Sequence, residues 1–138
     1  MADVTVVAAD VRPLPGCLIR RLTAGGTITV GAPVYVSAND TVIAADGSAV
    51  STSFAIGVCV SGNGASKTIP VTGDEVDVVT HGPVAGYSTN MAAGGVFWVS
   101  DTTGAICDAA SGATKDTVIG IGLSASVLLV RPQIVEFS

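Results

Sequence analysis

The sequence predicts an all-β fold: a small antiparallel β-barrel or β-sandwich built from two internally repeated β-units, with an extended N-terminal arm. Three observations support this prediction. The 138-residue chain is 49% apolar but only 4% aromatic, so its apolar content is mostly Ala and Val. Val, Ile and Thr favour pleated strands, and the 17 glycines mark tight turns between them. The third observation is that the sequence repeats itself.

The repeat aligns residues 31–61 with residues 94–124 at an offset of 63 positions, without a gap. The apolar positions agree in type and phase across this window. A second pair, residues 76–84 and 127–135, aligns at an offset of 51, so the first copy carries about 12 extra residues around 62–72. A β-unit that cannot bury its apolar face alone is stabilised by pairing with a second copy.

The chain is therefore expected to contain an arm, residues 1–15, and one β-domain, residues 16–138. The repeat units of this domain cover approximately residues 16–84 and 85–138. Short apolar or alternating runs bounded by Gly, Asn and Asp predict the strands, and no apolar period of 3.6 residues is long enough to predict a helix. The expected strands of the first unit are residues 18–22, 27–30, 34–37, 41–44, 54–60 and 75–80.

The N-terminal arm is the first candidate binding segment. Val4 to Val7 can form a short strand, after which Pro13 and Pro15 stop regular pairing. A short strand followed by prolines often extends from a core to a neighbouring molecule. We therefore expect Val4 and Val6 to add as a strand to the edge of a partner.

Basic residues are concentrated next to this arm. Arg12, Arg20 and Arg21 are three of the six basic residues, and no acidic residue lies between Arg12 and Arg21. This cluster predicts an acidic partner, and three solvated arginines explain it equally well. The net charge of −5 disfavours nucleic acid as the partner, because phosphate contacts need a basic face.

The surface is expected to be covered by other protein. The mean hydropathy of +0.64 is high for a chain with only 12% charged residues. A membrane is not the expected explanation, because the longest apolar run, Val118 to Val130, is too short to span as a helix. We expect a homo-oligomer, attachment to a larger assembly, or both.

No enzymatic activity, cofactor or metal site is expected. The sole histidine, His81, has no nucleophile motif to act with, and its surroundings are typical of a structural or exposed residue. Residues 62–68 lack the Gly before Lys67 and the following helix that a phosphate-binding loop needs. An odd number of cysteines argues against a disulfide framework and favours buried thiols at Cys17, Cys59 and Cys107.

Three of the six aromatic residues lie close together in the sequence: Tyr87, Phe97 and Trp98. Exposed aromatic side chains stack on sugars or bases. In a chain with so few aromatic residues, packing in a core or anchoring a subunit interface is the favoured role. These three residues are therefore candidate subunit-interface anchors.

A recurring order of turn and strand motifs runs through residues 24–26, 31–36, 55–58, 73–84, 93–99 and 119–123. This order resembles that of the small capsid decoration proteins of tailed bacteriophages, also called cement or head-stabilising proteins. The similarity covers roughly residues 16–135 and rests on strand pattern and composition.

This resemblance implies a structural virion protein, not an enzyme. Such a protein binds the major capsid protein on the outer surface of the capsid, usually as a trimer, and stabilises the expanded shell by bridging neighbouring capsomers. An arm reaching across the shell is common in such proteins, and residues 1–15 suit that part. The alternative is a glycan- or receptor-binding module of a head or tail fibre that uses Tyr87 and Trp98.

Overall fold

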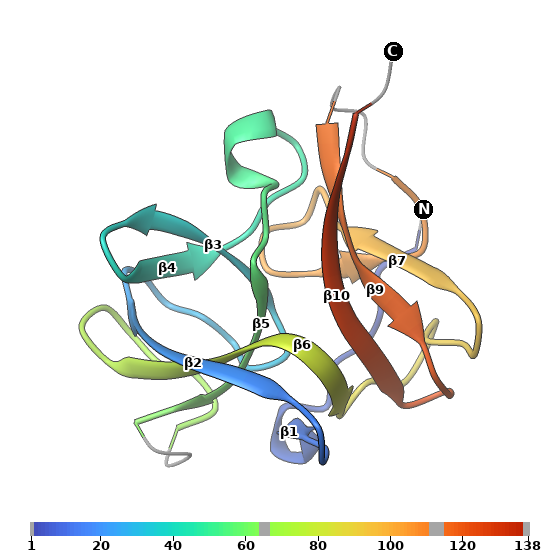
Figure 1. Cartoon of the computed structure of the whole chain (residues 1–138), viewed down its shortest axis with the longest axis horizontal. Coiled ribbons are helices and arrows are strands. Elements are labelled where there is room, and N and C mark those ends of the chain that lie inside the picture. Colours follow the sequence, from blue (N-terminus) through green and yellow to red (C-terminus); the bar gives the residue numbers. More distant parts are fainter. Residues whose placement is uncertain (1, 64–66, 111–114, 137–138) are drawn as a thin grey trace.

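The computed structural model describes residues 2–63, 67–110 and 115–136, and its architecture is almost entirely β, which confirms the predicted fold class. The strands are joined by tight turns and two short 3-10 helices, Ala8–Asp10 and Val50–Thr52 (Figure 1). In chain order the strands are β1 (Arg12–Pro13), β2 (Leu18–Ala24), β3 (Pro33–Ala38), β4 (Thr41–Ala44), β5 (Gly57–Gly62), β6 (Glu75–Ala85), β7 (Val96–Val99), β8 (Ile106–Cys107), β9 (Lys115–Gly122) and β10 (Val127–Glu136).

The first unit, β2 to β6, is a closed five-stranded barrel. Its strand order is β2-β4-β3-β5-β6, and β6 pairs with β2 to complete the circle. The parallel pair of β2 and β4, with Thr23 opposite Thr41, belongs to this closure. The interior is filled mainly by small and branched side chains: Leu22, Ala24, Ile28, Val30, Ala32, Val34, Val42, Cys59, Val76 and Val78.

The second unit, β7 to β10, repeats the strand order of the first. The order β4-β3-β5-β6 of the first unit becomes β8-β7-β9-β10 in the second. The register is also repeated, because Pro33 pairs with Val58 in the first unit and Val96 pairs with Ile121 in the second, at the same offset of 63 positions. The sequence repeat therefore corresponds to a repeat of strand pairing in the structure.

Strand β6 belongs to both units. Its N-terminal half pairs with β2 and β5, and its C-terminal half, residues 82–85, pairs with β10. In the first unit, Arg20 of β2 pairs with Val78 of β6. The position 63 residues after Arg20 is Pro83 of β6, and the position 51 residues after Val78 is Leu129 of β10, and these two residues also pair. The C-terminal half of β6 thus has the role in the second unit that β2 has in the first.

A second apolar cluster lies between the units and joins them. Val58 and Val79 belong to strands of the barrel but face away from its interior, into this cluster. The second unit contributes residues such as Phe97 and Leu128. We call this cluster the inter-unit core, and its buried members are Val4, Ala45, Ala55, Val58, Val60, Val79, Val84, Tyr87, Met91, Phe97, Val99, Ile106, Ile119, Leu128 and Val130.

Two expectations about the strands are corrected. Residues 27–30 do not form a ladder strand, although Ile28 and Val30 donate backbone hydrogen bonds to Pro70 and Thr68. Residues 1–15 do not extend away from the domain, because in the described part, from Ala2, this segment folds back onto its own chain. Part of the segment, β1, pairs with β6, and Asp3 is the bridge partner of Cys107 on β8 (Figure 1).

Candidate binding surface

The N-terminal segment is bound by its own chain, which corrects the expectation that Val4 and Val6 bind a partner. Val4 is only 5% exposed and belongs to the inter-unit core, and Val6 packs against the same core. The backbone is hydrogen bonded on both sides: Val4 N donates to Ile106 O at 2.7 Å, and Thr5 N donates to Thr89 O at 3.0 Å. In this state Val4 and Val6 are not available to another sheet.

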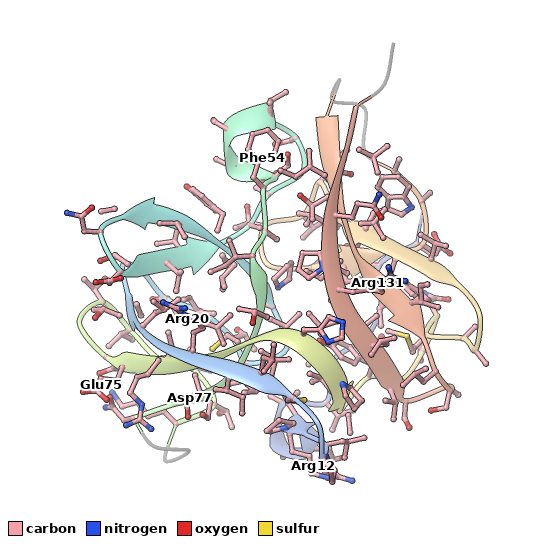
Figure 2. All side chains as sticks on the ribbon, in the orientation of Figure 1. Arg12, Arg20, Phe54, Glu75, Asp77 and Arg131 are labelled. Carbon is pink, nitrogen blue, oxygen red and sulfur yellow. The ribbon has the colours of Figure 1, made fainter. Side chains whose placement is uncertain are left out.

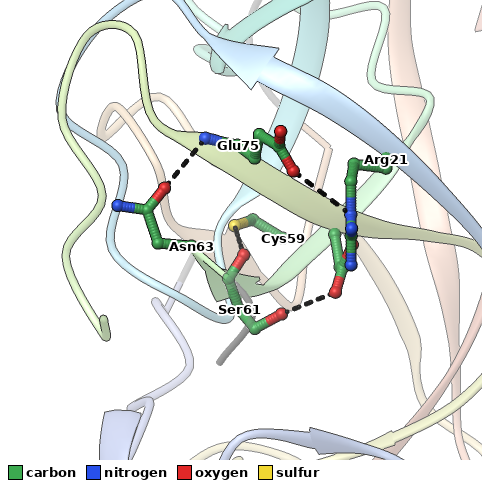
Figure 3. A network of polar contacts seen from close by, with 6 residues as sticks. Arg21, Cys59, Ser61, Asn63 and Glu75 are labelled. Atoms are coloured by element: carbon green, nitrogen blue, oxygen red, sulfur yellow. Dashed lines mark hydrogen bonds and ion pairs between the residues drawn. The ribbon is translucent and has the colours of Figure 1, made fainter. Parts of the chain in front are cut away.

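The three arginines proposed to face a partner lie in different surroundings. Arg21 Nε is 3.1 Å from Asp77 Oδ1 and 3.6 Å from Glu75 Oε2, so its charge is already paired within the chain (Figure 3). The hydrogen bond to Asp77 raises the pKa of Arg21. Arg12 is exposed and donates to a backbone carbonyl, and Arg20 is exposed on β2 with no ion pair among the described residues. Arg20 and Arg12 therefore remain candidates, and Arg21 has a structural role.

Two of the three candidate subunit-interface anchors are buried inside the chain, which corrects that assignment. Tyr87 is 2% exposed and Phe97 is 1% exposed, both within the inter-unit core. Tyr87 Oη donates a hydrogen bond of 2.9 Å to Gly31 O, which satisfies its polar end. Trp98 is half-buried on β7. Neither Tyr87 nor Phe97 can stack on a sugar from these positions.

An apolar surface lies on the outer side of the second unit. Val96, Ile121 and Leu129 are successive cross-strand partners on β7, β9 and β10, and cross-strand partners project from the same face of a sheet. Val96 is 45% exposed, and the other two are half-buried. With the half-buried Val118, these residues form what we call the outer apolar face.

In the first unit, the equivalent row of cross-strand partners is covered by other parts of the chain. The corresponding residues of the barrel, Pro33 and Val58, are buried, and so is Val79, the partner of Val58 on β6. Val58 and Val79 are covered because they form part of the inter-unit core. The second unit covers this row of the first, whereas no part of the described chain covers the outer apolar face to the same extent.

Two adjoining depressions lie along β10 beside this face. One, of about 180 Å³, is lined by Val96, Val118, Ile121, Arg131 and Gln133. The other, of about 410 Å³, shares Arg131 and Gln133 and is also lined by His81 and Pro132. Arg131 and Gln133 therefore lie between the apolar side chains on one side and His81 and Pro132 on the other, and Figure 2 shows Arg131 beside β10.

The exposed apolar area continues from this surface onto β2. Leu18 is the cross-strand partner of His81, and Leu18 and Ile19 are 65% and 48% exposed. Exposed apolar side chains that adjoin one another mark interaction sites more often than isolated ones. The candidate binding surface thus extends from Leu18 through His81 and Arg131 to the outer apolar face.

Sequence reasoning missed this surface, although a signal was present. Residues 127–130 are four consecutive apolar residues, with no alternation between an inner and an outer face. Such a run is typical of a strand that is covered on both sides. Here Leu128 and Val130 face the inter-unit core, and Leu129 faces outward, where a partner would cover it.

The three cysteine thiols lie in buried or partly buried places. Burial raises the pKa of Cys59 to about 12 and raises that of Cys17 and Cys107 as well, so none is an activated thiolate. Within residues 2–63, 67–110 and 115–136, no group of three or more His, Cys, Asp or Glu could hold a metal ion. In the same ranges no helix is long and apolar enough to cross a membrane.

A comparison with protein-family models finds no match, and a search of curated proteins finds none either.

Proposed function

We propose that this chain is a structural virion protein that binds the outer surface of a bacteriophage capsid and stabilises the expanded shell by bridging neighbouring capsomers. The observation that carries the proposal is the outer apolar face, which includes Val96, Ile121 and Leu129. Its counterpart in the first unit is covered within the chain, whereas no part of the described chain covers this face to the same extent. Burial of apolar area is worth about 25 cal/mol per Å², so a protein partner is favoured over water.

The chemistry of the surface suits the major capsid protein as the partner. Arg131 and Arg20 are exposed and make no ion pair among the described residues, so each can pair with an acidic group. Paired charges around an apolar centre are typical of specific protein interfaces. The resemblance of the strand motifs to decoration proteins adds the capsid as the source of that partner, and a trimer as the favoured form on the shell.

This binding mode differs from the one that the arm predicts. Val4 and Val6 are engaged within the chain, so the proposed capsid contact uses the sheet surface of β2, β6, β10, β9 and β7. A glycan- or receptor-binding module is the alternative, but Tyr87, one of its two candidate aromatic residues, is buried. The capsid proposal therefore depends on apolar side chains, and the alternative depends on Trp98.

The proposal is tested with Ile121→Glu and Leu18→Glu, which place a charge in the surface without touching the inter-unit core. We expect each variant to fold and to lose at least tenfold in affinity for expanded capsids, because a tenfold loss corresponds to only about 1.4 kcal/mol. Binding is measured by co-sedimentation with shells assembled without this protein. Stoichiometry is counted in the same pellets, since a decoration protein should approach the copy number of the shell protein.

The matched control is Val36→Glu. Val36 is 50% exposed, comparable to Leu18, but lies on β3 in the first unit. It should bind capsids as the unmodified chain does. Normal capsid binding by folded Ile121→Glu and Leu18→Glu would contradict the proposal, and binding to host cells or glycans that is lost in Trp98→Ala would support the alternative.

A further inference from the structure

The N-terminal segment occupies the place of a strand in the second unit. In the first unit, Thr23 and Ala24 of β2 pair directly with Thr41 and Val42 of β4. At the offset of 63, Thr23 and Ala24 correspond to residues 86–87, and Thr41 and Val42 correspond to residues 104–105. In the described chain these two segments do not pair with each other as strands. The N-terminal segment lies between these two places.

The backbone of this segment is held along both edges. On one side Asp3 is the bridge partner of Cys107, and on the other Val6 is the bridge partner of Tyr87. The main-chain hydrogen bonds are Val4 N to Ile106 O, Asp108 N to Ala2 O, Thr5 N to Thr89 O, Ser88 N to Thr5 O and Val7 N to Gly86 O, with lengths of 2.7 to 3.2 Å. We call the space between β8 and residues 86–89 the strand groove.

Side chains of the segment alternate between the groove and the surface. Val4 is buried and Val6 is half-buried, whereas Asp3, Thr5 and Val7 are exposed. Val6 also lies so close to Gly31 that a side chain there would collide with it. Main-chain pairing combined with sites for alternate side chains is the mode by which sheets bind extended peptides in general.

The connection between this segment and the rest of the chain is slight. Residues Ala8–Asp10 form a single 3-10 turn with no buried residue. Beyond the turn, β1 pairs with β6 and Leu14 N donates to Pro83 O at 2.9 Å. The turn can therefore change conformation while β1 stays in place, and a hinge of this kind permits exchange of identical elements between copies.

We propose that the strand groove binds the N-terminal segment, Ala2 to Val7, of a second copy of this chain in place of its own. Each exchanged segment makes the same hydrogen bonds and buries the same Val4 side chain as before. A groove can hold the segment of its own chain or that of another copy. Which of the two it holds depends on the protein concentration relative to the effective concentration of the tethered segment, about 1 mM for a short flexible linker. Strand exchange needs no capsid, so it is independent of the proposed function.

The test uses two full-length chains, both with Cys17→Ser. The donor carries Asp3→Cys and Cys107→Ser, and the acceptor keeps Asp3 and Cys107. Neither chain can form a disulfide between these positions by itself. Position 3 and Cys107 are opposite each other as a non-hydrogen-bonded pair, whose Cα atoms lie about 4.5 Å apart, within the range that a disulfide requires.

The expected result is a donor–acceptor disulfide after mixing near 1 mM under oxidised glutathione, identified by mass spectrometry and decreasing on dilution. The matched control donor carries Asp10→Cys in place of Asp3→Cys, because Asp10 is exposed in the turn and has no position opposite Cys107. It should form at least tenfold less of the linked pair. A further variant lacking residues 8–10 should form more of it, because the shortened connection hinders return to its own groove.

A chain with Asp3→Cys and native Cys107 establishes the geometry, since it should close the disulfide within one molecule when dilute. If this disulfide closes and the donor–acceptor pair links no more than the Asp10→Cys control, the proposal is overturned. If the internal disulfide does not close, the oligomeric state of the variant lacking residues 8–10 is the test. A folded monomer at about 1 mM overturns strand exchange, and a dimer that unfolds to monomers supports it.

Discussion

At the scale of single residues, Tyr87 shows how one side chain links the two units. Its ring is buried in the inter-unit core, and its hydroxyl donates to Gly31 O, 56 positions earlier in the chain. Desolvation by burial raises the pKa of Tyr87 well above its usual range, so the hydroxyl keeps its proton and remains a donor. The hydrogen bond to Gly31 O is therefore expected to be insensitive to pH in the neutral range.

Tyr87→Phe should lower the free energy of unfolding by about 1–3 kcal/mol, because it leaves a buried carbonyl without its partner. Urea unfolding followed by circular dichroism measures this change. Tyr35→Phe is the control, since Tyr35 is half-exposed and should change stability by less than about 0.5 kcal/mol. Equal stability of both variants would show that the Gly31 carbonyl finds another donor.

At the scale of elements, two glycines occupy equivalent places where strands cross closely. A Cβ at Gly57 of β5 would collide with the carbonyl oxygen of Val79 on β6, and a Cβ at Gly120 of β9 would collide with that of Leu129 on β10. Gly57 and Gly120 are 63 positions apart. The repeat therefore preserves the close approach of backbones as well as the apolar pattern.

Gly57→Ala and Gly120→Ala should each destabilise the protein by roughly 1–3 kcal/mol, because a methyl group forced into a packed site shifts the backbone. Differential scanning calorimetry or urea unfolding measures the change. Gly26→Ala is the control, since its new Cβ would meet only Ile43 Cγ2, at an ordinary contact distance of 3.6 Å. A variant at Gly57 or Gly120 as stable as this control would contradict the repeat of close packing.

Local pattern was enough to predict most strands but not the place of the arm. Residues 54–60 alternate apolar and small residues, which predicts a strand without reference to any partner, and β5 begins within this run, at Gly57, and ends two residues beyond it, at Gly62. Val4, in contrast, has a neighbour on β8 more than 100 positions away, and no local pattern specifies such a partner. For Tyr87 and Phe97 the sequence left a core and a subunit interface as alternatives, since apolar character does not distinguish the two, and the structure places both side chains in the core.

At the scale of the whole molecule, the inter-unit core makes the two units interdependent. Val58 and Val79 would be exposed if the barrel were folded and the second unit were not. The loops between strands add polar links: Thr103 Oγ1 donates to Asp46 Oδ2 at 2.7 Å, and Gly47 N donates to Ser100 O at 2.8 Å. Hydrogen bonds from Ser48 and Thr103 lower the pKa of Asp46, so its charged form is the one stabilised by folding.

The two units should therefore unfold in one transition. Trp98 is the sole tryptophan and reports on the second unit by fluorescence, whereas Cys59 lies in the barrel interior. Because burial raises the pKa of Cys59 to about 12, its thiol should react with a disulfide reagent at pH 8 only when the barrel opens. In a Cys17→Ser, Cys107→Ser chain, the two curves in urea should share one midpoint, and a difference of more than about 0.5 M would contradict a shared core.

The double role of β6 limits where this chain can change length during evolution. A single inserted or deleted residue in the middle of β6 would turn every following side chain to the opposite face, and so would misplace the attachment of β10 while the barrel half stayed in register. The lengths of the two copies differ around residues 62–72, ahead of β6 and outside its pairing with β10. A length change is therefore expected to be tolerated around residues 62–72 and to disrupt the second unit when it falls within β6.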